Sequence, residues 1–225
     1  MKQTSFFLAV IFISAGLPSC NNPTSEPHNE SSEAYETMST SADTINQHTS
    51  GFTTAMHQMM NNMHQLPMTG NVDKDFALMM KSHHQGAVDM SQYEASHGTD
   101  ESLQKLAATM AEAQKKEIEQ MEVRIAALNK APKNYDPGKT QEGFGKVMSD
   151  NMNMMMEMSK MDTSMATDHQ FVAMMIPHHQ SAVFMSEGFL KYGKDPQLLD
   201  MARKMIVDQK KEIAAFENWM NMHKQ

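Results

Sequence analysis

The sequence predicts an all-α domain in which one helical unit occurs twice. Apolar residues recur at helical spacing along most of the chain, and the alternating pattern of a β-strand is scarce. Residues 73–122 align without a gap with residues 168–217, and 22 of these 50 positions are identical. Because one copy cannot bury its apolar face alone, we expect the two copies to pack around a single core.

The N-terminal segment predicts a targeting sequence that is separate from the fold. An apolar run at residues 6–17 is too short to span a membrane, and it is followed by Leu17-Pro18-Ser19-Cys20, which resembles a bacterial lipobox. We expect residues 1–19 to be a signal peptide. Cys20, the only cysteine, is then expected to be lipidated and to anchor the protein to a membrane. Secretion with an unmodified Cys20 is the alternative, since Pro18 is unusual in a lipobox.

The segment after Cys20 predicts a flexible tether at residues 20–50. It is rich in Asn, Ser, Thr and Glu and has almost no large apolar side chains, so it cannot bury enough surface to fold. The duplicated helical domain then occupies residues 51–225, with copies at about 52–129 and 146–223. The formal net charge of −8 argues against a nucleic-acid partner and is compatible with binding cations.

The first copy predicts a methionine-rich helical segment at 52–66, followed by two long helices. The first long helix begins near residue 72 and ends near Gly98, since glycine suits the left-handed position past a helix end. The second has Asp100 as its N-cap and continues to about residue 129, before Pro132.

The second copy predicts the same three helices after a connection at residues 130–143. Its methionine-rich segment covers 146–165. Thr167 and Gln170 have the spacing of a capping box, which predicts the start of a helix that ends at Gly193. The last helix is predicted to begin after Asp195, with Pro196 in its first turn.

Both copies carry the pattern Met-Met-x-x-His-His-Gln-x-Ala-Val-x-Met-Ser, at residues 79–91 and 174–186. At about 100° per residue, His83 lies at the centre of the apolar face of its helix, whereas His84 points to the flank. In each copy both histidines follow a methionine by four residues, so these pairs are neighbours on the helix. The pairs are Met79/His83, Met80/His84, Met174/His178 and Met175/His179.

A Gln-x-x-Glu pair interrupts the apolar stripe of the partner helix in each copy, as Gln114 with Glu117 and as Gln209 with Glu212. Polar groups at buried positions need partners, and the inward histidine is the partner we expect. A carboxylate that accepts a hydrogen bond from one imidazole nitrogen would fix the tautomer of the histidine and make its other nitrogen a more basic metal ligand. Direct metal ligation by the carboxylate is the other option.

The residue types in these motifs predict copper binding. The chain contains 27 methionines and 11 histidines, and soft thioethers select Cu(I) without the proton loss or disulfide chemistry of thiolates. We expect a first site from inward residues, and a second kind of site from the flanking pairs Met80/His84 and Met175/His179. The inward residues are His83, His178, Met79, Met90, Met174 and Met185, supported by Glu117 and Glu212. Core packing inherited by both copies is the alternative.

A stripe of methionines in the segment 146–165 follows one helical face. We expect Met148, Met152, Met155 and Met158 to add copper-binding capacity of low specificity. Methionine stripes are more often core, because methionine fills irregular gaps well. Sacrificial oxidation and an adaptable surface for partner helices are further alternatives.

The spaced motifs together resemble the domain-of-unknown-function family numbered 305. They are Phe-x-x-Met-Met-x-x-His-His-Gln-x-Ala-Val-x-Met, then Gly-x-Asp, then Gln-Lys-Lys-Glu-Ile, and the likeness covers about residues 72–222 in both copies. The resemblance implies an exported protein with a ferritin-like four-helix core at 72–98, 100–129, 167–192 and 195–223. Some members of the family are associated with periplasmic copper binding and copper tolerance. The resemblance assigns paired histidines to 83, 84, 178 and 179, the following methionine to 90 and 185, and Gln-x-x-Glu to 114–117 and 209–212.

An enzymatic alternative comes from di-iron members of ferritin-like bundles, which use Glu-x-x-His on two helices. Glu94 and His97 have this spacing, but Phe189 and Tyr192 stand at the equivalent positions, so the second half of such a site is missing. The sequence therefore predicts an extracytoplasmic protein that is not an enzyme. It is expected to bind Cu(I), with Cu(II) and silver as further candidates, for sequestration or for transfer to a partner. A helical interaction module with a methionine-rich surface is the alternative.

Overall fold

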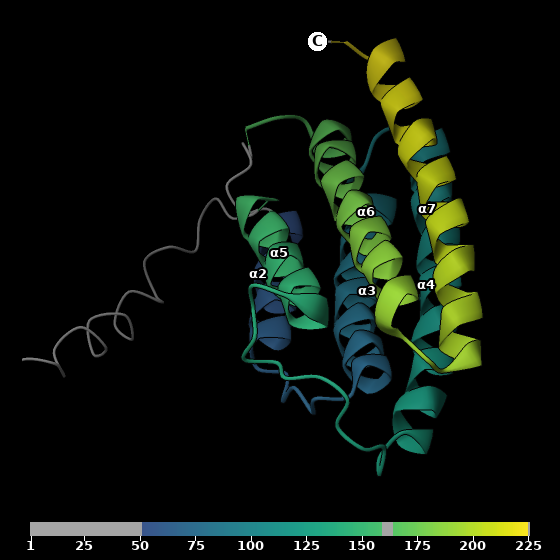
Figure 1. Ribbon diagram of the computed structural model, residues 1–225. Helices are drawn as coiled ribbons and strands as arrows, with labels where there is room; N and C mark the ends of the chain where they lie inside the picture. Colours follow the sequence, from purple (N-terminus) through teal and green to yellow (C-terminus); the bar gives the residue numbers. More distant parts are fainter. Residues whose placement is uncertain (1–50, 159–163, 225) are drawn as a thin grey trace, which may run out of the picture. The chain divides into compact units, whose positions relative to one another are not determined.

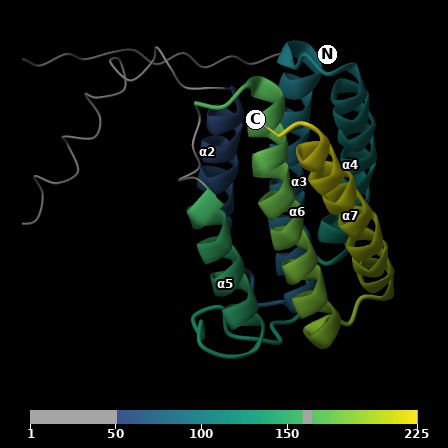
Figure 2. The same cartoon turned by 90° about the horizontal axis from the view of Figure 1, so that it is seen from above.

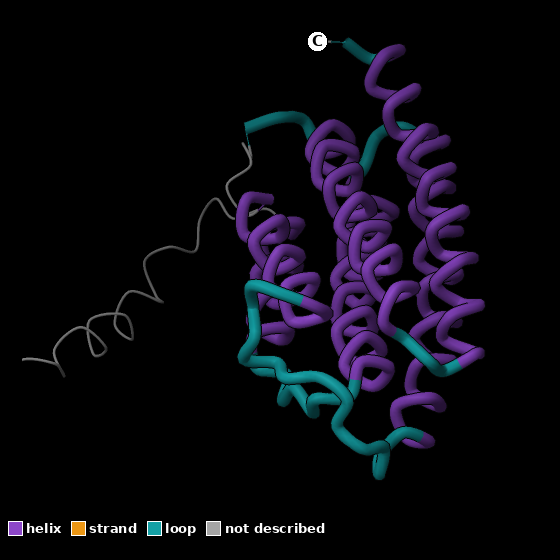
Figure 3. The backbone as a smooth tube through the Cα atoms, viewed as in Figure 1, coloured by secondary structure: helices purple, strands orange, loops and turns teal. Residues whose placement is uncertain are grey.

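Six helices make up the part of the chain that this computed structural model describes, residues 51–158 and 164–224. No strand occurs among those residues (Figure 3), so the all-α prediction is confirmed. The helices are α2 (Gly51–His64), α3 (Val72–His97), α4 (Glu101–Ala127), α5 (Gly143–Met158), α6 (Thr167–Tyr192) and α7 (Pro196–Met222). None of these helices is both long and apolar enough to cross a membrane. The predicted signal peptide, Cys20 and tether lie outside the described residues.

The helices are arranged in three layers, with α3 and α6 in the middle (Figure 1, Figure 2). One outer layer consists of α2 and α5, which pack against α3 and α6 respectively. The other consists of α4 and α7, which pack against the same two helices from the opposite side. The predicted four-helix core is therefore present as α3, α4, α6 and α7. Because the middle helices are covered on both sides, the flanks that carry His84 and His179 are also interior.

Aspartates fix the starts of the two outer long helices as predicted. The Asp100 carboxylate accepts hydrogen bonds from the backbone N–H groups of Ser102 and Leu103, and Asp195 caps α7 in the same way. The predicted capping box of Thr167 with Gln170 is wrong. The N-cap of α6 is Ala166, whose methyl side chain cannot accept a hydrogen bond, so Thr167 is the first helical residue and not the cap. The Gln170 side chain donates to the Met165 carbonyl.

Glycine ends both middle helices for a different reason from the predicted one. Gly98 and Gly193 have φ of −64° and −68°, so neither is left-handed. A Cβ atom at Gly98 would lie 2.3 Å from Glu94 Oε1, and one at Gly193 would lie 2.3 Å from the Phe189 ring. The glycines therefore make room for the side chain one turn earlier, a buried group in both copies.

Two equivalent aspartates, Asp73 and Asp168, connect the copies at opposite ends of the middle layer. Asp73 at the start of α3 accepts hydrogen bonds of 2.7 and 2.8 Å from the backbone N–H groups of Lys194 and Asp195. Asp168 at the start of α6 accepts one of 2.8 Å from Thr99 N–H. Each copy thus satisfies the backbone at the corner between the long helices of the other copy, and α3 and α6 are antiparallel.

Methionine is a principal core residue of the domain. Buried methionines come from all six helices, with side chains at most 8% exposed: Met56, Met59, Met60, Met63, Met79, Met80, Met90, Met110, Met121, Met148, Met155, Met158, Met174, Met175, Met185 and Met205. On α5, Met148, Met155 and Met158 are buried and Met152 is half-buried. The described part of this helix extends to Met158, and the residues from 159 to 163 in the predicted stripe lie outside the described part.

Replacing Asp73 with alanine is expected to destabilise the domain by about 1–3 kcal/mol, because the buried N–H of Asp195 and the partly buried N–H of Lys194 would lose their acceptor. Urea unfolding followed by circular dichroism measures the change in unfolding free energy. Asp200→Ala is the matched control, since the Asp200 side chain is 79% exposed and forms an ion pair with Arg203 on its own helix. Equal stability of the two variants would contradict a structural role for the exchanged contacts.

Candidate metal centre

Four histidines lie in the interior of the domain, and each is at most 1% exposed. His83 of α3 and His178 of α6 face each other where the two middle helices meet, with ring centroids 3.7 Å apart and ring planes inclined by 33°. His84 and His179 lie next to them on the sides that face α4 and α7. The structure thus brings together the paired histidines of both copies in one buried layer.

A short hydrogen-bond chain sets the tautomer of His83. The Ser181 hydroxyl donates to Asn151 Oδ1 at 2.8 Å, so its oxygen is left to accept from His83 Nε2–H at 3.2 Å. The neutral ring then carries its lone pair on Nδ1. This atom is buried and has no hydrogen-bond partner among the described residues. An unpaired lone pair in an apolar interior is costly, and a bound cation would satisfy it.

The glutamates of the Gln-x-x-Glu pairs contact the flanking histidines. His84 Nε2 lies 2.9 Å from Glu117 Oε2, and His179 Nε2 lies 2.8 Å from Glu212 Oε2. The prediction that these carboxylates support His83 and His178 is therefore wrong, because α4 and α7 cover the flank of the middle layer and not the contact between α3 and α6. Each carboxylate nevertheless contacts one ring nitrogen of a paired histidine. A neutral ring that donates from Nε2 to a carboxylate presents the Nδ1 lone pair, and among the described residues neither Nδ1 atom has a hydrogen-bond partner.

His178 differs from its equivalent, because both of its ring nitrogens lack a hydrogen-bond partner in the described part. The copies diverge here: Gly86 stands where the second copy has Ser181. A Cβ atom at Gly86 would lie 2.4 Å from Met59 Sδ, so this thioether occupies the space next to the missing side chain. One copy therefore offers a hydroxyl at this place and the other a sulfur atom.

The central rings are held in the form that binds metal. Burial lowers the pKa of His83 and of His178 well below the usual value, and repulsion between neighbouring imidazoles lowers it further. Both rings are therefore neutral at pH 7. Burial raises the pKa of Glu117, but the hydrogen bond with His84 and the ammonium group of Lys204 outweigh this effect, so the net pKa is below its usual value. Glu117 is thus a carboxylate.

All six methionines of the predicted sites are interior. Met80, Met90, Met175 and Met185 are fully buried, and Met79 and Met174 are 4% and 5% exposed. Helical side chains lean toward the N-terminus of their helix, so we expect each histidine ring to lie near the methionine four residues before it. Within the described residues, no three His, Cys, Asp or Glu side chains gather in an arrangement that could hold a metal ion. A metal bound here would therefore use imidazole nitrogen together with thioether sulfur.

Comparison with known proteins identifies the family of this helical arrangement. The sequence matches the family described as Domain of unknown function (DUF305) over residues 17–125 and 73–220. The chain belongs to the DUF305 family. No curated protein matches the chain significantly.

Solved structures similar to this DUF305 chain include several forms of CopM. CopM in the Cu(I)-bound form is 25% identical, covers 68% of this chain and 98% of its own, and superposes with a TM-score of 0.52. The Ag-bound form obtained by soaking has the same identity and TM-score. The Cu(II)-bound form is 28% identical over 67% of this chain and 97% of CopM, with a TM-score of 0.50. The predicted family and helical fold are thereby confirmed.

The Glu-x-x-His pair of the enzymatic alternative does not form one site. Glu94 is fully buried beside Asp168, whereas His97 is exposed and stacks on Tyr93, with ring centroids 4.1 Å apart. Burial raises the pKa of Glu94 to about 8, and the nearby Asp168 and Asp100 carboxylates contribute. Glu94 is therefore a protonated structural acid at neutral pH.

Sequence reasoning missed several residues that define this centre. Ser181 and Asn151 orient His83, and Asp73 and Asp168 hold the middle helices in register. Asn151 could have been found, since it lies at helical spacing between Met148 and Met155 and is therefore a polar residue on a buried stripe. The identity of Asp73 and Asp168 across the copies indicated a shared role.

The raised pKa of Glu94 has a consequence for stability. The folded state keeps the proton between about pH 5 and pH 8, whereas the unfolded state loses it, so stability falls as the pH rises through this interval. The loss is at most about 1.4 kcal/mol per pH unit for one proton. Glu94→Gln removes this loss, and urea unfolding of both proteins at pH 5, 6.5 and 8 measures the difference in slope. Glu101→Gln, at a side chain 86% exposed, is the control. Parallel pH profiles of wild type and Glu94→Gln would refute the assignment.

Proposed function

We propose that this DUF305 protein binds Cu(I) at the buried histidines and methionines, and holds it for sequestration or for transfer in metal tolerance. Copper is the cargo of the protein and not a cofactor for turnover. The observation that carries the proposal is that the Nδ1 atoms of His83, His84 and His179, in a methionine-rich interior, have no hydrogen-bond partner among residues 51–158 and 164–224. The three Nε2–H groups already have acceptors, so each ring is oriented for a ligand at Nδ1.

The charge of the centre favours a monovalent soft ion. Imidazole and thioether are neutral ligands, so a bound Cu(I) leaves a single positive charge in the interior, whereas a divalent ion leaves twice that charge and has a larger desolvation cost. Silver, also monovalent and soft, is expected to occupy the same centre. Cu(II) is expected at the flanking histidines, where Glu117 and Glu212 supply negative charge. The CopM structures with Cu(I), Cu(II) and silver support this choice of ions.

We also propose that the protein acts outside the cytoplasm. The apolar run at residues 6–17 and the lipobox-like sequence before Cys20 support export and a lipid anchor, with residues 20–50 as the tether. Thioether ligands suit that compartment, because methionine does not form disulfides. Binding without catalysis is part of the proposal, as is a transfer partner if the copper is delivered.

The alternative with a methionine-rich docking surface has little support in the described residues. Among the large apolar side chains that are exposed there, only Met156 and Met222 are methionines. The methionines of the two histidine motifs are buried, and on α5 Met148, Met155 and Met158 are buried while Met152 is half-buried. Core packing without metal binding is therefore the alternative that experiments must exclude.

The double variant His83→Gln/His178→Gln is expected to lower Cu(I) affinity at least about tenfold, because both central imidazoles are lost while the polar atoms and most of the volume remain. Competition with a chromogenic Cu(I) chelator measures the affinity, and circular dichroism checks the helix content. His57→Gln, on the exposed side of α2, is the control. Unchanged affinity in a folded double variant would show that these histidines serve only the core.

Changing Met148, Met152, Met155 and Met158 together to leucine is expected to reduce the number of Cu(I) ions bound. Leucine has a similar volume, so each change should cost less than about 1.5 kcal/mol of stability. The same chelator competition counts the ions, and urea unfolding reports the stability. If the variant binds as many ions as the wild type, the α5 stripe is packing alone.

A further inference from the structure

We propose that metal reaches the buried histidines through the groove between α4 and α7, and that Lys204 makes the two copies load in order, the second copy first. This inference rests on the proposed function. The groove would be the route to the centre. Lys204 would distinguish the His84/Glu117 pair from the His179/Glu212 pair, which otherwise have similar geometry.

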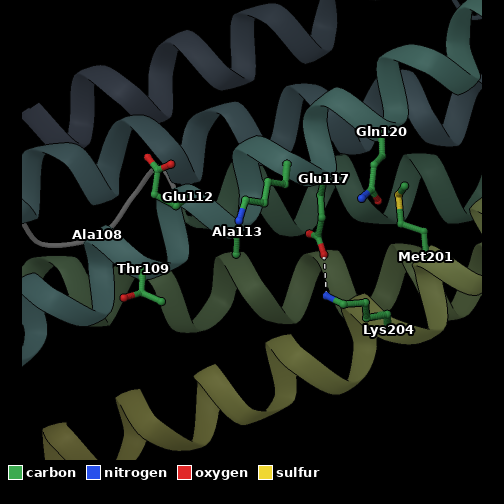
Figure 4. Close-up of a pocket in the computed structure, with 9 residues that line it drawn as sticks. Ala108, Thr109, Glu112, Ala113, Glu117, Gln120, Met201 and Lys204 are labelled. Atoms are coloured by element: carbon green, nitrogen blue, oxygen red, sulfur yellow. Dashed lines mark hydrogen bonds and ion pairs between the residues drawn. The ribbon is translucent and has the colours of Figure 1, made fainter.

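The groove lies on the outer layer of the domain. A cavity of about 700 Å³ is lined by α4, including Glu117, and by Met201 and Lys204 of α7 (Figure 4). A smaller cavity of about 230 Å³ shares Glu117 and Lys204 and is also lined by Glu212, Gln114 and Gln209. The Gln-x-x-Glu pairs of both copies therefore line the same groove.

Each glutamate connects the groove to a histidine that solvent does not reach. His84 and His179 have no exposed side-chain surface, whereas the side chains of Glu117 and Glu212 are 14% and 23% exposed. A cation that enters the groove meets a carboxylate first, and the ring beyond it presents its lone pair to the interior. The Oε1 atoms of Gln114 and Gln209, which line the smaller cavity, are buried and lack a hydrogen-bond partner in the described part of the chain, so they are further neutral ligand atoms beside this path.

The two glutamates differ in one neighbour. Lys204 Nζ lies 3.5 Å from Glu117 Oε1 and 2.8 Å from Asp208 Oδ2 (Figure 4 shows the first contact). At the equivalent positions the first copy has Thr109 and Ala113. Among the described residues, Glu212 has only His179 as an ion-pair partner.

This difference in charge sets the order of loading. An ammonium group at Glu117 repels an incoming cation and competes with it for the carboxylate. Lys204 is 68% exposed and already pairs with Asp208, so it can leave Glu117 without being buried elsewhere. The carboxylate of Glu212 carries no such competitor. His179 is therefore the first flanking histidine to receive metal, and His84 follows when Lys204 is displaced.

Site-resolved silver titration tests the order. Ag(I) is added to the full mature chain labelled with ¹⁵N in its histidine rings, and NMR follows His84 and His179 separately. In the wild type, the His179 signals are expected to reach half of their change at an Ag(I) concentration about threefold lower than the one at which the His84 signals do. An affinity difference of about threefold corresponds to the free energy of an exposed ion pair such as the one between Lys204 and Glu117. In Lys204→Thr, which copies the residue of the first copy, the two rings are expected to respond together.

The reciprocal variant and a control complete the design. Lys204→Thr/Thr109→Lys moves the ammonium group to the Glu212 side and is expected to reverse the order. Lys210→Thr is the control, since Lys210 is exposed and pairs with Glu187 away from the groove. An equal response of both rings in the wild type, or an unchanged order in Lys204→Thr, overturns the inference while leaving metal binding in place. Absence of any histidine response to Ag(I) overturns the proposed function itself.

Discussion

Burying four imidazole rings in one layer of a helical domain is costly unless the ring N–H groups, which water cannot reach, find an acceptor. Three of the four rings have one, each from a different helix: Ser181 of α6 for His83, Glu117 of α4 for His84 and Glu212 of α7 for His179. His178 has none among the described residues. Asn151 of α5 in turn accepts from Ser181. The histidines thus tie the middle layer to both outer layers. The outer helices are therefore part of the metal centre as well as a cover for the core.

The same arrangement explains why the centre combines nitrogen with sulfur. Glu117 and Glu212 lie at the edge of the layer, where part of each side chain still meets solvent. The motif residues beyond them are histidines and methionines, whose potential ligand atoms are imidazole nitrogen and thioether sulfur. A carboxylate placed between α3 and α6 would be an unpaired charge in an apolar region, or it would hold a proton as Glu94 does. Methionine adds ligand atoms there without adding charge, and it packs the core at the same time.

Helix positions and the aspartate caps of α4 and α7 could be predicted, because apolar periodicity and capping chemistry are local properties of the chain. Which histidine each glutamate contacts could not be predicted. A helical projection places His83 and His84 at different angles around α3, but it does not tell which neighbouring helix lies at each angle. The residue type predicts a left-handed conformation for Gly98, whereas the glycine is needed there because a larger side chain would collide with Glu94. These errors share one cause: they depend on contacts between segments far apart in the sequence.

The contacts of Asp73 and Asp168 make each copy of the helical unit depend on the other. Each aspartate satisfies backbone N–H groups that belong to the opposite half of the sequence, at the corner that follows α6 or α3. A polypeptide of half this length would leave its own corner unsatisfied and its histidine face open to water. Two such polypeptides would resolve both problems by associating across a two-fold axis, each offering the same patch to the other. The present molecule has the two-fold arrangement of an isologous homodimer within one chain, and Ser181 and Lys204 are features of one side only.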